Sequence, residues 1–195
     1  MADPGTVLAV NGSYYTRHGT PDTPLVSDGA LLGPVSYAAT HGAFVASGAS
    51  AGIRDLADGD WRAALAGARD AMVSYPLLLA ADGSSRAGNS RWLANRSFVA
   101  QDAAGRIVIG TTTEAFFSLD RLAAFLRTAP LDLTLALNLD GGPVACQGIA
   151  LGTFQRRFCG KWELAEDDHG TRLLSWHWGR YGRAALPVVL AAVRR

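Results

Sequence analysis

The sequence predicts an α+β protein: a mixed β-sheet core with two main helices, folded as a single domain over residues 1–195. Short apolar runs that end in Gly, Pro or Asp recur along the whole chain, which is typical of strands. Only two segments show the three- and four-residue apolar spacing of a helix. Helices and strands do not alternate regularly, as they would in a doubly wound parallel sheet.

Composition and charge narrow the class of partner. The chain is 49% hydrophobic and has a net charge of +1, with both signs interspersed, so nucleic acid and anionic membranes are not expected partners. No apolar run approaches the roughly 18 residues of a membrane span. The N-terminus lacks the basic region and apolar core of a signal peptide. We therefore expect a soluble protein that acts on a small polar ligand, with its compartment and oligomeric state undetermined.

The N-terminal half contains the first predicted helix, over residues 61–73. Its apolar residues recur at helical spacing, Asp58 or Asp60 can cap its start, and Pro76 prevents its continuation. The residues that form this apolar stripe are Trp61, Leu65, Ala68 and Met72. Strands are expected at residues 6–10, 43–46 and 76–81.

The C-terminal half contains a predicted hairpin, a helix and the most apolar strand. Residues 96–100 and 106–109 form the hairpin, with its turn at 102–105, and Ser118 is placed to cap a helix over residues 119–127. The segments expected after this helix are a buried strand at 131–139, a hairpin at 162–178 with its turn at 167–170, and a terminal strand at 187–193.

The buried strand at residues 131–139 ends in an acid, Asp140, followed by Gly141, Gly142 and Pro143. The glycines permit a close approach of a ligand or another backbone, and the proline stops the strand. Asn138 lies two residues before Asp140 and is expected on the same face of the strand. A tight turn with no further role is the alternative interpretation of this Asp-Gly-Gly stretch.

Polar residues follow three other predicted strands in the same way. These strand ends are Asn11-Gly12, Asp82-Gly83 and Glu114, which follows three threonines. With Asn138 to Gly142 they make four polar strand ends, and we expect these ends to converge on one cleft.

The order and wording of these motifs resemble the phosphodiester glycosidase family over roughly residues 6–150. The matching stretches are Asn11-Gly-Ser-Tyr-Tyr15, Asp28-Gly29, Tyr75-Pro76 with Asp82-Gly83, Arg96-Ser97, the helix from Ser118, and Asn138-Leu-Asp-Gly-Gly142. This chain has Val144 where the family often has a serine. The resemblance implies hydrolysis of the anomeric bond of a sugar 1-phosphodiester, and an exported protein.

The resemblance and the chemistry together assign roles to individual residues. A glycosyl transition state is positively charged, so the carboxylate of Asp140 is expected beside the anomeric carbon, with Glu114 as a second acid. Arg96 has the planar fork that binds phosphate, although a structural salt bridge is its alternative role. The residues expected to contact substrate or to shape its site are Asn11, Asp82, Arg96, Asn138, Gly141 and Gly142. Either asparagine could instead tie down a loop.

No cofactor is expected, because the chain has no paired histidines for zinc and no phosphate-cradling loop followed by Lys-Ser or Lys-Thr. A divalent cation is possible but not indicated.

Two questions stay open at this level. The first is whether the chain is instead a non-catalytic carbohydrate-binding or structural module, since sugars stack on aromatic faces and Trp162, Trp176 and Trp178 lie on one predicted hairpin. The second is whether Cys146 and Cys159 form a disulfide or remain buried thiols.

Overall fold

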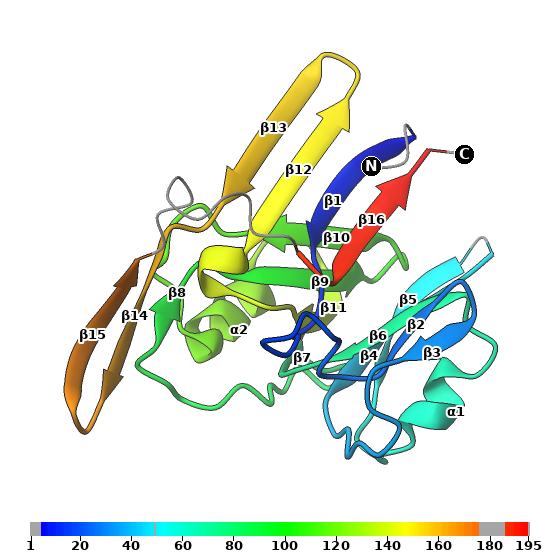
Figure 1. Cartoon of the computed structure of the whole chain (residues 1–195), viewed down its shortest axis with the longest axis horizontal. Coiled ribbons are helices and arrows are strands. Elements are labelled where there is room, and N and C mark those ends of the chain that lie inside the picture. The colour runs from blue at the N-terminus through cyan, green and yellow to red at the C-terminus, as the bar shows by residue number, and fades with distance from the viewer. Residues whose placement is uncertain (1–4, 49, 176–185, 195) are drawn as a thin grey trace.

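The computed structural model describes residues 5–48, 50–175 and 186–194. Within these residues it contains two α-helices, a short 3-10 helix and four β-sheets, which confirms the α+β class (Figure 1). The sequence predicted a mixed sheet, with parallel and antiparallel strands. Instead, each strand pair in the described part of the chain is antiparallel. Tight hairpins join many successive strands, and such connections favour antiparallel pairing.

The central sheet is covered on both faces and contains the predicted buried strand. Its order is β10 (Ile107–Thr111), β9 (Ser97–Asp102), β11 (Leu133–Asn138) and β7 (Leu77–Leu79). Helix α2 (Leu119–Thr128) covers one face with Leu122 and Leu126, and the opposite face packs against the five-stranded sheet through Leu77 and Leu137. Because both faces are buried, β7 and β11 read as continuous apolar runs rather than alternating ones. The predicted hairpin, helix and central strand are all confirmed here.

The first predicted helix, over residues 61–73, is wrong in its second half, which forms a strand of the five-stranded sheet. The order of this sheet is β3 (Ala30–Leu32), β2 (Leu25–Ser27), β6 (Asp70–Ser74), β4 (Gly42–Ser47) and β5 (Ser50–Asp55). Helix α1 covers only Trp61–Leu65, capped by Asp60, and the chain turns at Gly67 with a φ of 70°. Residues 70–73 form part of β6 instead, since hydrogen bonds to β2 on one side and β4 on the other outweigh the helical spacing.

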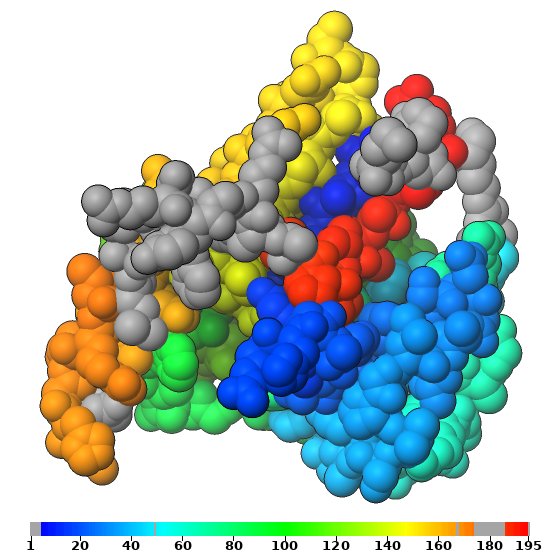
Figure 2. Space-filling model, viewed as in Figure 1, coloured from blue at the N-terminus to red at the C-terminus, as the bar shows by residue number. Residues whose placement is uncertain are grey.

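A third sheet joins the two ends of the described chain. Its order is β13 (Phe154–Cys159), β12 (Cys146–Leu151), β1 (Thr6–Asn11) and β16 (Val189–Val193). The pairing of β1 with β16 confirms both predicted terminal strands. The β12–β13 hairpin projects from the body of the molecule (Figures 1 and 2).

The fourth sheet confirms the predicted C-terminal hairpin as far as residue 175. Its order is β15 (Gly170–Ser175), β14 (Trp162–Asp167) and β8 (Leu93–Ala94). Trp176 and Trp178 lie outside the described residues. The hairpin lies at the opposite side of the molecule from the five-stranded sheet (Figures 1 and 2). Among the described helices, neither has the length and apolarity that a membrane crossing requires.

Candidate active site

Three of the four polar strand ends meet at one edge of the central sheet. The main-chain nitrogen of Asp140 donates to the oxygen of Gly12 (3.0 Å), and that of Leu139 donates to the oxygen of Ser97 (2.9 Å). Strand β10 ends at the same edge, because Thr111 pairs with Ser97. These hydrogen bonds and the pairing of β10 with β9 bring the ends of β1, β10 and β11 together, as the sequence predicted.

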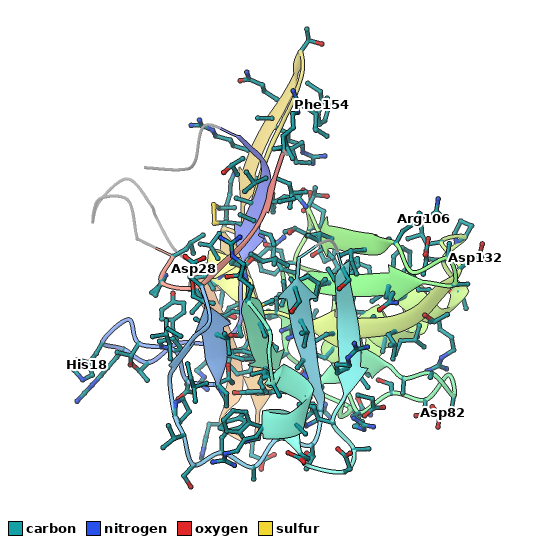
Figure 3. All side chains as sticks on the ribbon, turned by 90° about the vertical axis from the view of Figure 1, so that its right-hand side faces the viewer. His18, Asp28, Asp82, Arg106, Asp132 and Phe154 are labelled. Atoms are coloured by element: carbon teal, nitrogen blue, oxygen red, sulfur yellow. A yellow bond between two sulfur atoms is a disulfide. The ribbon has the colours of Figure 1, made fainter. Side chains whose placement is uncertain are left out.

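The fourth strand end, Asp82-Gly83, lies at the other end of the sheet. Strand β7 runs antiparallel to β11, with Leu79 opposite Ala136, so the residues after β7 lie near the start of β11. Figure 3 shows Asp82 on the same side of the molecule as Arg106 and Asp132, which mark the β9–β10 turn and the approach to β11. The expectation that all four ends converge is therefore wrong for Asp82, because antiparallel pairing reverses the direction of β7.

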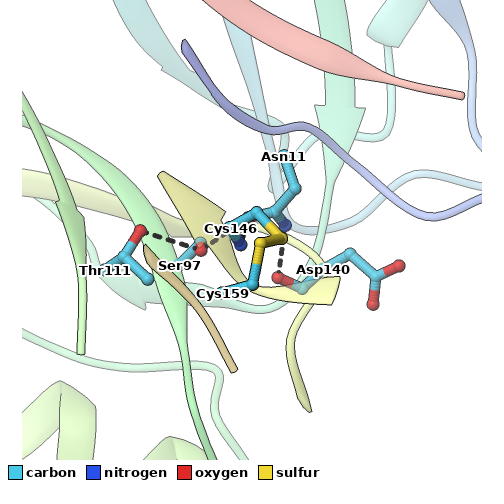
Figure 4. Close-up of a disulfide and its surroundings, with 6 residues drawn as sticks. All are labelled: Asn11, Ser97, Thr111, Asp140, Cys146 and Cys159. Atoms are coloured by element: carbon cyan, nitrogen blue, oxygen red, sulfur yellow. Dashed lines mark hydrogen bonds between the residues drawn. A yellow bond between two sulfur atoms is a disulfide. The ribbon is translucent and has the colours of Figure 1, made fainter. Parts of the chain in front are cut away.

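Asn11 holds the loop that carries Asp140. Its Nδ2 donates to the main-chain oxygen of Asp140 (2.6 Å), and its Oδ1 accepts from Ser97 Oγ (2.6 Å) and from the nitrogen of Cys146 (3.1 Å). The residue is 2% exposed. Figure 4 shows the carboxylate of Asp140 directed away from this cluster. The amide of Asn11 thus fixes the backbone of the site, the loop-tying role that the sequence left as an alternative.

Cys146 and Cys159 form a disulfide directly beside Asn11 (Figure 4). The two cysteines lie opposite each other at the base of the β12–β13 hairpin. The bridge therefore joins the strand that follows Asp140 to the strand that leads into β14. Of the two alternatives for these cysteines, the structure forms the disulfide.

The carboxylate of Asp140 is partly buried, and its Oδ1 accepts a hydrogen bond from the nitrogen of Gly141 (2.8 Å). Burial raises the pKa of Asp140 from 3.8 to about 6, and the negative charge of Glu163 adds to the rise. The Gly141 hydrogen bond and the charge of Arg96 act in the opposite direction. A carboxylate whose pKa lies close to neutral pH is suited to acid–base and electrostatic catalysis.

Glu163 is the second carboxylate near Asp140, and the sequence did not single it out. It lies on β14 opposite Ala94 of β8, and its Oε2 accepts from Trp92 Nε1 (3.0 Å). A Cβ atom at Gly142 would lie 2.5 Å from this oxygen, and Gly142 has a φ of 67°. Gly142 is thus required both for its backbone conformation and for the close approach of Glu163. No local pattern around Glu163 indicates this, because the pairing of β14 with β8 places it there.

Glu114, the predicted second acid, has an exposed side chain. It follows β10 at the correct edge of the sheet, but within the described residues it makes no hydrogen bond or ion pair. The carboxylate whose charge acts on Asp140 is Glu163 instead.

Arg96 lies next to Asp140 and is 8% exposed. Its Nε donates to the oxygen of Phe117 (3.0 Å) and its Nη2 to the oxygen of Trp92 (2.7 Å). Nη1 has no hydrogen-bond partner in the described part of the chain, and a Cβ at Gly141 would lie 3.4 Å from it. Burial lowers the pKa of Arg96, whereas Tyr14 and the charges of Glu163 and Asp140 raise it.

The guanidinium is thus fixed by two carbonyl groups rather than by a salt bridge, since Arg96 has no ion-pair partner among the described residues. Its Nη1 remains available to a ligand beside Gly141. The close neighbours of Gly141 are Arg96 and the main-chain oxygen of Asn95, 3.0 Å from where a Cβ would lie. This glycine allows Asp140 and Arg96 to come close together.

Asn138 is fully buried and supports a pair of tyrosines that the sequence did not assign to the site. Its Nδ2 donates to Tyr14 Oη (2.7 Å) and to the main-chain oxygen of Tyr75 (3.1 Å). Tyr14 Oη donates to the same main-chain oxygen (2.8 Å). The two tyrosine rings stack with centroids 4.3 Å apart. Burial and then the charge of Asp140 raise the pKa of Tyr14, so its hydroxyl stays protonated.

Within the described residues, no group of three or more His, Cys, Asp and Glu side chains is arranged to hold a metal ion. The candidate site contains two carboxylates, a guanidinium and tyrosine hydroxyls. This set can bind a phosphate group and stabilise a developing positive charge beside it.

A sequence model of the family described as phosphodiester glycosidase matches residues 4–145, which is more than half of the chain. A search of curated proteins found no match. Among solved structures, the chain is similar to the catalytic domain of zebrafish N-acetylglucosamine-1-phosphodiester alpha-N-acetylglucosaminidase, auto-inhibited by its pro-peptide. The identity is 18% and the TM-score 0.52, with 80% of this chain and 58% of that chain covered.

A hypothetical protein from Synechocystis is similar over 79% of this chain and 49% of its own, with 16% identity and a TM-score of 0.46. The chain thus spans less than two thirds of either solved structure. At 18% identity, the likeness to the zebrafish catalytic domain concerns the fold.

Proposed function

The chain belongs to the phosphodiester glycosidase family, and on that premise we propose that it hydrolyses sugar 1-phosphodiesters between the anomeric carbon and the phosphodiester oxygen. One observation carries the proposal. A partly buried Asp140, whose pKa is raised to about 6, lies beside Arg96 with its unpartnered Nη1 and within the electrostatic reach of Glu163. A glycosyl phosphodiester presents an anionic phosphate next to a carbon that becomes positive during cleavage, and the site offers a complementary charge to each.

In the proposed reaction, Arg96 binds the phosphate and stabilises it as the leaving group. The phosphate monoester leaves as a stable anion, so the reaction depends less on a strong acid than the cleavage of a glycoside with an alcohol leaving group does. Ionised Asp140 faces the anomeric carbon and stabilises the oxocarbenium-like transition state. Glu163 takes the role first assigned to Glu114 and accepts a proton from the attacking water. The products are a free sugar and a phosphate monoester.

The proposed substrate class is a small-molecule or glycan phosphodiester, since N-acetylglucosamine 1-phosphodiester appears in the name of the zebrafish relative. No step of the proposed reaction uses a cofactor. The Cys146–Cys159 disulfide supports an oxidising compartment, and we place the protein outside the cytoplasm on that basis.

A non-catalytic carbohydrate-binding module is the second candidate function, because exposed aromatic side chains flank the site. Trp92 is 46% exposed and Phe116 is 60% exposed, and Phe116 contacts Trp162 with ring centroids 6.0 Å apart. Trp92 also donates to Glu163, so this aromatic surface adjoins the candidate catalytic groups. It fits the aglycone side of a substrate as well as it fits a binding platform.

Hydrolysis in heavy-oxygen water tests the proposal. The purified protein is incubated with a panel of sugar 1-phosphodiesters, including that of N-acetylglucosamine, and the products are analysed by mass spectrometry. We expect the heavy oxygen in the released sugar, because water attacks the anomeric carbon. Heavy oxygen in the phosphate product would show cleavage at phosphorus and contradict the proposal. Sugar binding without turnover of any substrate in the panel would favour the binding module.

A further inference from the structure

A cavity of about 230 Å³ lies beside Tyr75, one of the two stacked tyrosines of the candidate active site. The segment from Tyr37 to His41 forms one wall, and Val73, Ser74 and Tyr75 at the end of β6 form the other. Its volume is below the ~300–1,000 Å³ of pockets for drug-sized ligands, which suits a single small ring. Tyr75 belongs both to this cavity and to the stacked pair that contacts Asn138.

Three of the lining residues carry a polar group that has no hydrogen-bond partner among the residues the structure describes. Within the described residues, the hydroxyls of Tyr37 and Tyr75 and the Nε2 of His41 make no hydrogen bond. His41 Nδ1 accepts from the nitrogen of Leu77 (3.4 Å), which directs the Nε2 proton of the neutral imidazole away from the backbone. Ligand groups with both donors and acceptors would satisfy all three.

The cavity is electrically neutral. Burial and then the charge of Arg86 lower the pKa of His41, so its imidazole is uncharged at neutral pH. Burial is also the main cause that raises the pKa of Tyr37 and of Tyr75, and their hydroxyls therefore remain protonated donors. None of the lining side chains is Arg, Lys, Asp or Glu. A neutral, hydroxyl-rich ligand matches this lining better than an anion does.

The walls of the cavity are held in place from outside. Arg86 Nη1 donates to the oxygens of Thr40 (3.0 Å) and His41 (2.8 Å), and Arg86 Nη2 contacts Asp55 at 2.6 Å. On the other wall, Ser74 Oγ donates to the oxygen of Asn138 (2.6 Å). The polar groups thus project from fixed backbone, which reduces the entropy cost of binding.

Tyr75 connects this cavity to the candidate active site. Its ring stacks on Tyr14, whose hydroxyl accepts from Asn138 Nδ2 (2.7 Å), two residues before Asp140. Burial, Asp22 and Asp140, in that order, raise the pKa of Tyr75. Arg96 does not line the cavity.

We propose that the Tyr37–His41–Tyr75 cavity is a subsite for a neutral sugar unit on the glycone side of the substrate. This assignment rests on the proposed function for its orientation, since the phosphate is assigned to Arg96 and Arg96 does not line the cavity. Aromatic faces from Tyr37 and Tyr75 and hydrogen bonds from three unpartnered groups are the features that bind sugar rings. The unit is either the glycone ring itself or a second sugar attached to it.

Binding of a neutral glycoside tests the subsite without any hydrolysis. Methyl α-glucopyranoside and methyl N-acetyl-α-glucosaminide are titrated into the isotope-labelled protein, and methyl resonances are followed by NMR. We expect shifts at Ala38, Ala39 and Thr40 with at least one of the two glycosides, whereas inorganic phosphate leaves these resonances unchanged. Unchanged resonances with both glycosides at their solubility limit would overturn the proposal.

Variants that remove single hydroxyls sharpen this test. Tyr37→Phe and Tyr75→Phe keep the aromatic rings and should each weaken glycoside binding by about tenfold, the effect of one hydrogen bond in a small site. Tyr15→Phe, outside the cavity, is the matched control and should bind as the wild type does. Equal affinity in Tyr37→Phe and Tyr75→Phe would show that the glycoside binds elsewhere and would overturn the assignment.

Kinetics then distinguish the two sources of the sugar unit. If the glycone ring occupies the cavity, Tyr37→Phe raises KM for phosphodiesters of single sugars. If a second sugar occupies it, KM rises only for substrates whose glycone carries another sugar. A KM that is unchanged for both substrate types contradicts the subsite. Because glycoside binding is measured separately, a protein that binds glycosides in the cavity but hydrolyses nothing would refute the proposed function alone.

Discussion

Asp82 and Asp140 share a local pattern, a buried strand followed by Asp-Gly, but they lie in different environments. Each follows a buried strand and precedes a glycine. Asp82 is exposed, its Oδ1 accepts from the nitrogen of Ser84 (2.9 Å), and hydrogen bonds to Ser84 lower its pKa. Asp140 is partly buried next to Arg96 and Glu163, and its pKa is raised to about 6. An Asp-Gly strand end therefore becomes a catalytic candidate only through the residues that the fold brings to it.

Activity should separate these two aspartates most clearly. We expect Asp140→Asn to lower kcat/KM for a sugar 1-phosphodiester by about a hundredfold or more, because a neutral amide cannot stabilise the developing positive charge. Asp82→Asn, the matched control, should retain wild-type activity, since asparagine also accepts the turn hydrogen bond. Wild-type rates in Asp140→Asn would remove the distinction between the two sites and with it the assignment of Asp140.

Stability should respond to the same two substitutions with opposite signs. The folded state binds the Asp140 proton more tightly than the unfolded state does. The ionised carboxylate therefore lowers the free energy of unfolding increasingly as pH rises from 3.8 to about 6, and the loss persists above that. Asp140→Asn removes this cost, and we expect it to raise the free energy of unfolding by about 3 kcal/mol at pH 7, with the gain vanishing at pH values well below 3.8.

Asp82 has a lowered pKa, so its charge stabilises the fold at neutral pH and loses that effect as pH falls through the folded pKa. Asp82→Asn should therefore lower stability slightly at pH 7 and not at acidic pH. Thermal denaturation of both variants between pH 3 and pH 8 measures the contrast. A gain from Asp140→Asn that is the same at every pH would show that burial of the charge is not its cause.

Arg96 extends the comparison to the charge that only Asp140 has beside it. We expect Arg96→Lys to lower kcat/KM by about tenfold, because lysine keeps the positive charge but loses the Nη1 group that faces the site. The Tm should fall as well, since the oxygens of Phe117 and Trp92 lose their donors.

Arg106→Lys is the control, because Arg106 pairs with Asp102 at the far β9–β10 turn. Phosphate binding to each variant, measured by calorimetry, separates the two effects of Arg96→Lys. If Arg96→Lys loses stability but binds phosphate as the wild type does, Arg96 is only a structural residue.

The two glutamates give the smallest and most specific test. Glu163→Gln removes a negative charge near Asp140 and should lower the pKa of the Asp140 carboxyl, as followed by carbon NMR of the side chain. Glu114→Gln should leave that titration unchanged. A shift in Glu114→Gln of the same size would restore Glu114 as the second acid.

Most secondary structure could be predicted because it depends on local patterns. The β9–β10 turn, the start of α2 and the buried strand β11 were found from hydrophobic spacing and turn residues. The helix predicted over residues 61–73 failed beyond Leu65, since β6 gains hydrogen bonds on both edges from strands distant in sequence. The spacing of apolar residues does not show which distant strands will pair with this segment.

The family, the α+β class and the position of Asp140 at the end of a buried strand follow from the amino-acid sequence, because strand patterns and an Asn-Leu-Asp-Gly-Gly motif are local properties. The groups that surround Asp140 depend on the folded chain. In the fold, the pairing of β14 with β8 places Glu163 near Asp140. Glu114 is exposed, and Asp82 lies at the opposite end of the central sheet. The reason is physical: a pKa depends on burial and on charges within a few ångströms, and strand register sets both across large distances in sequence.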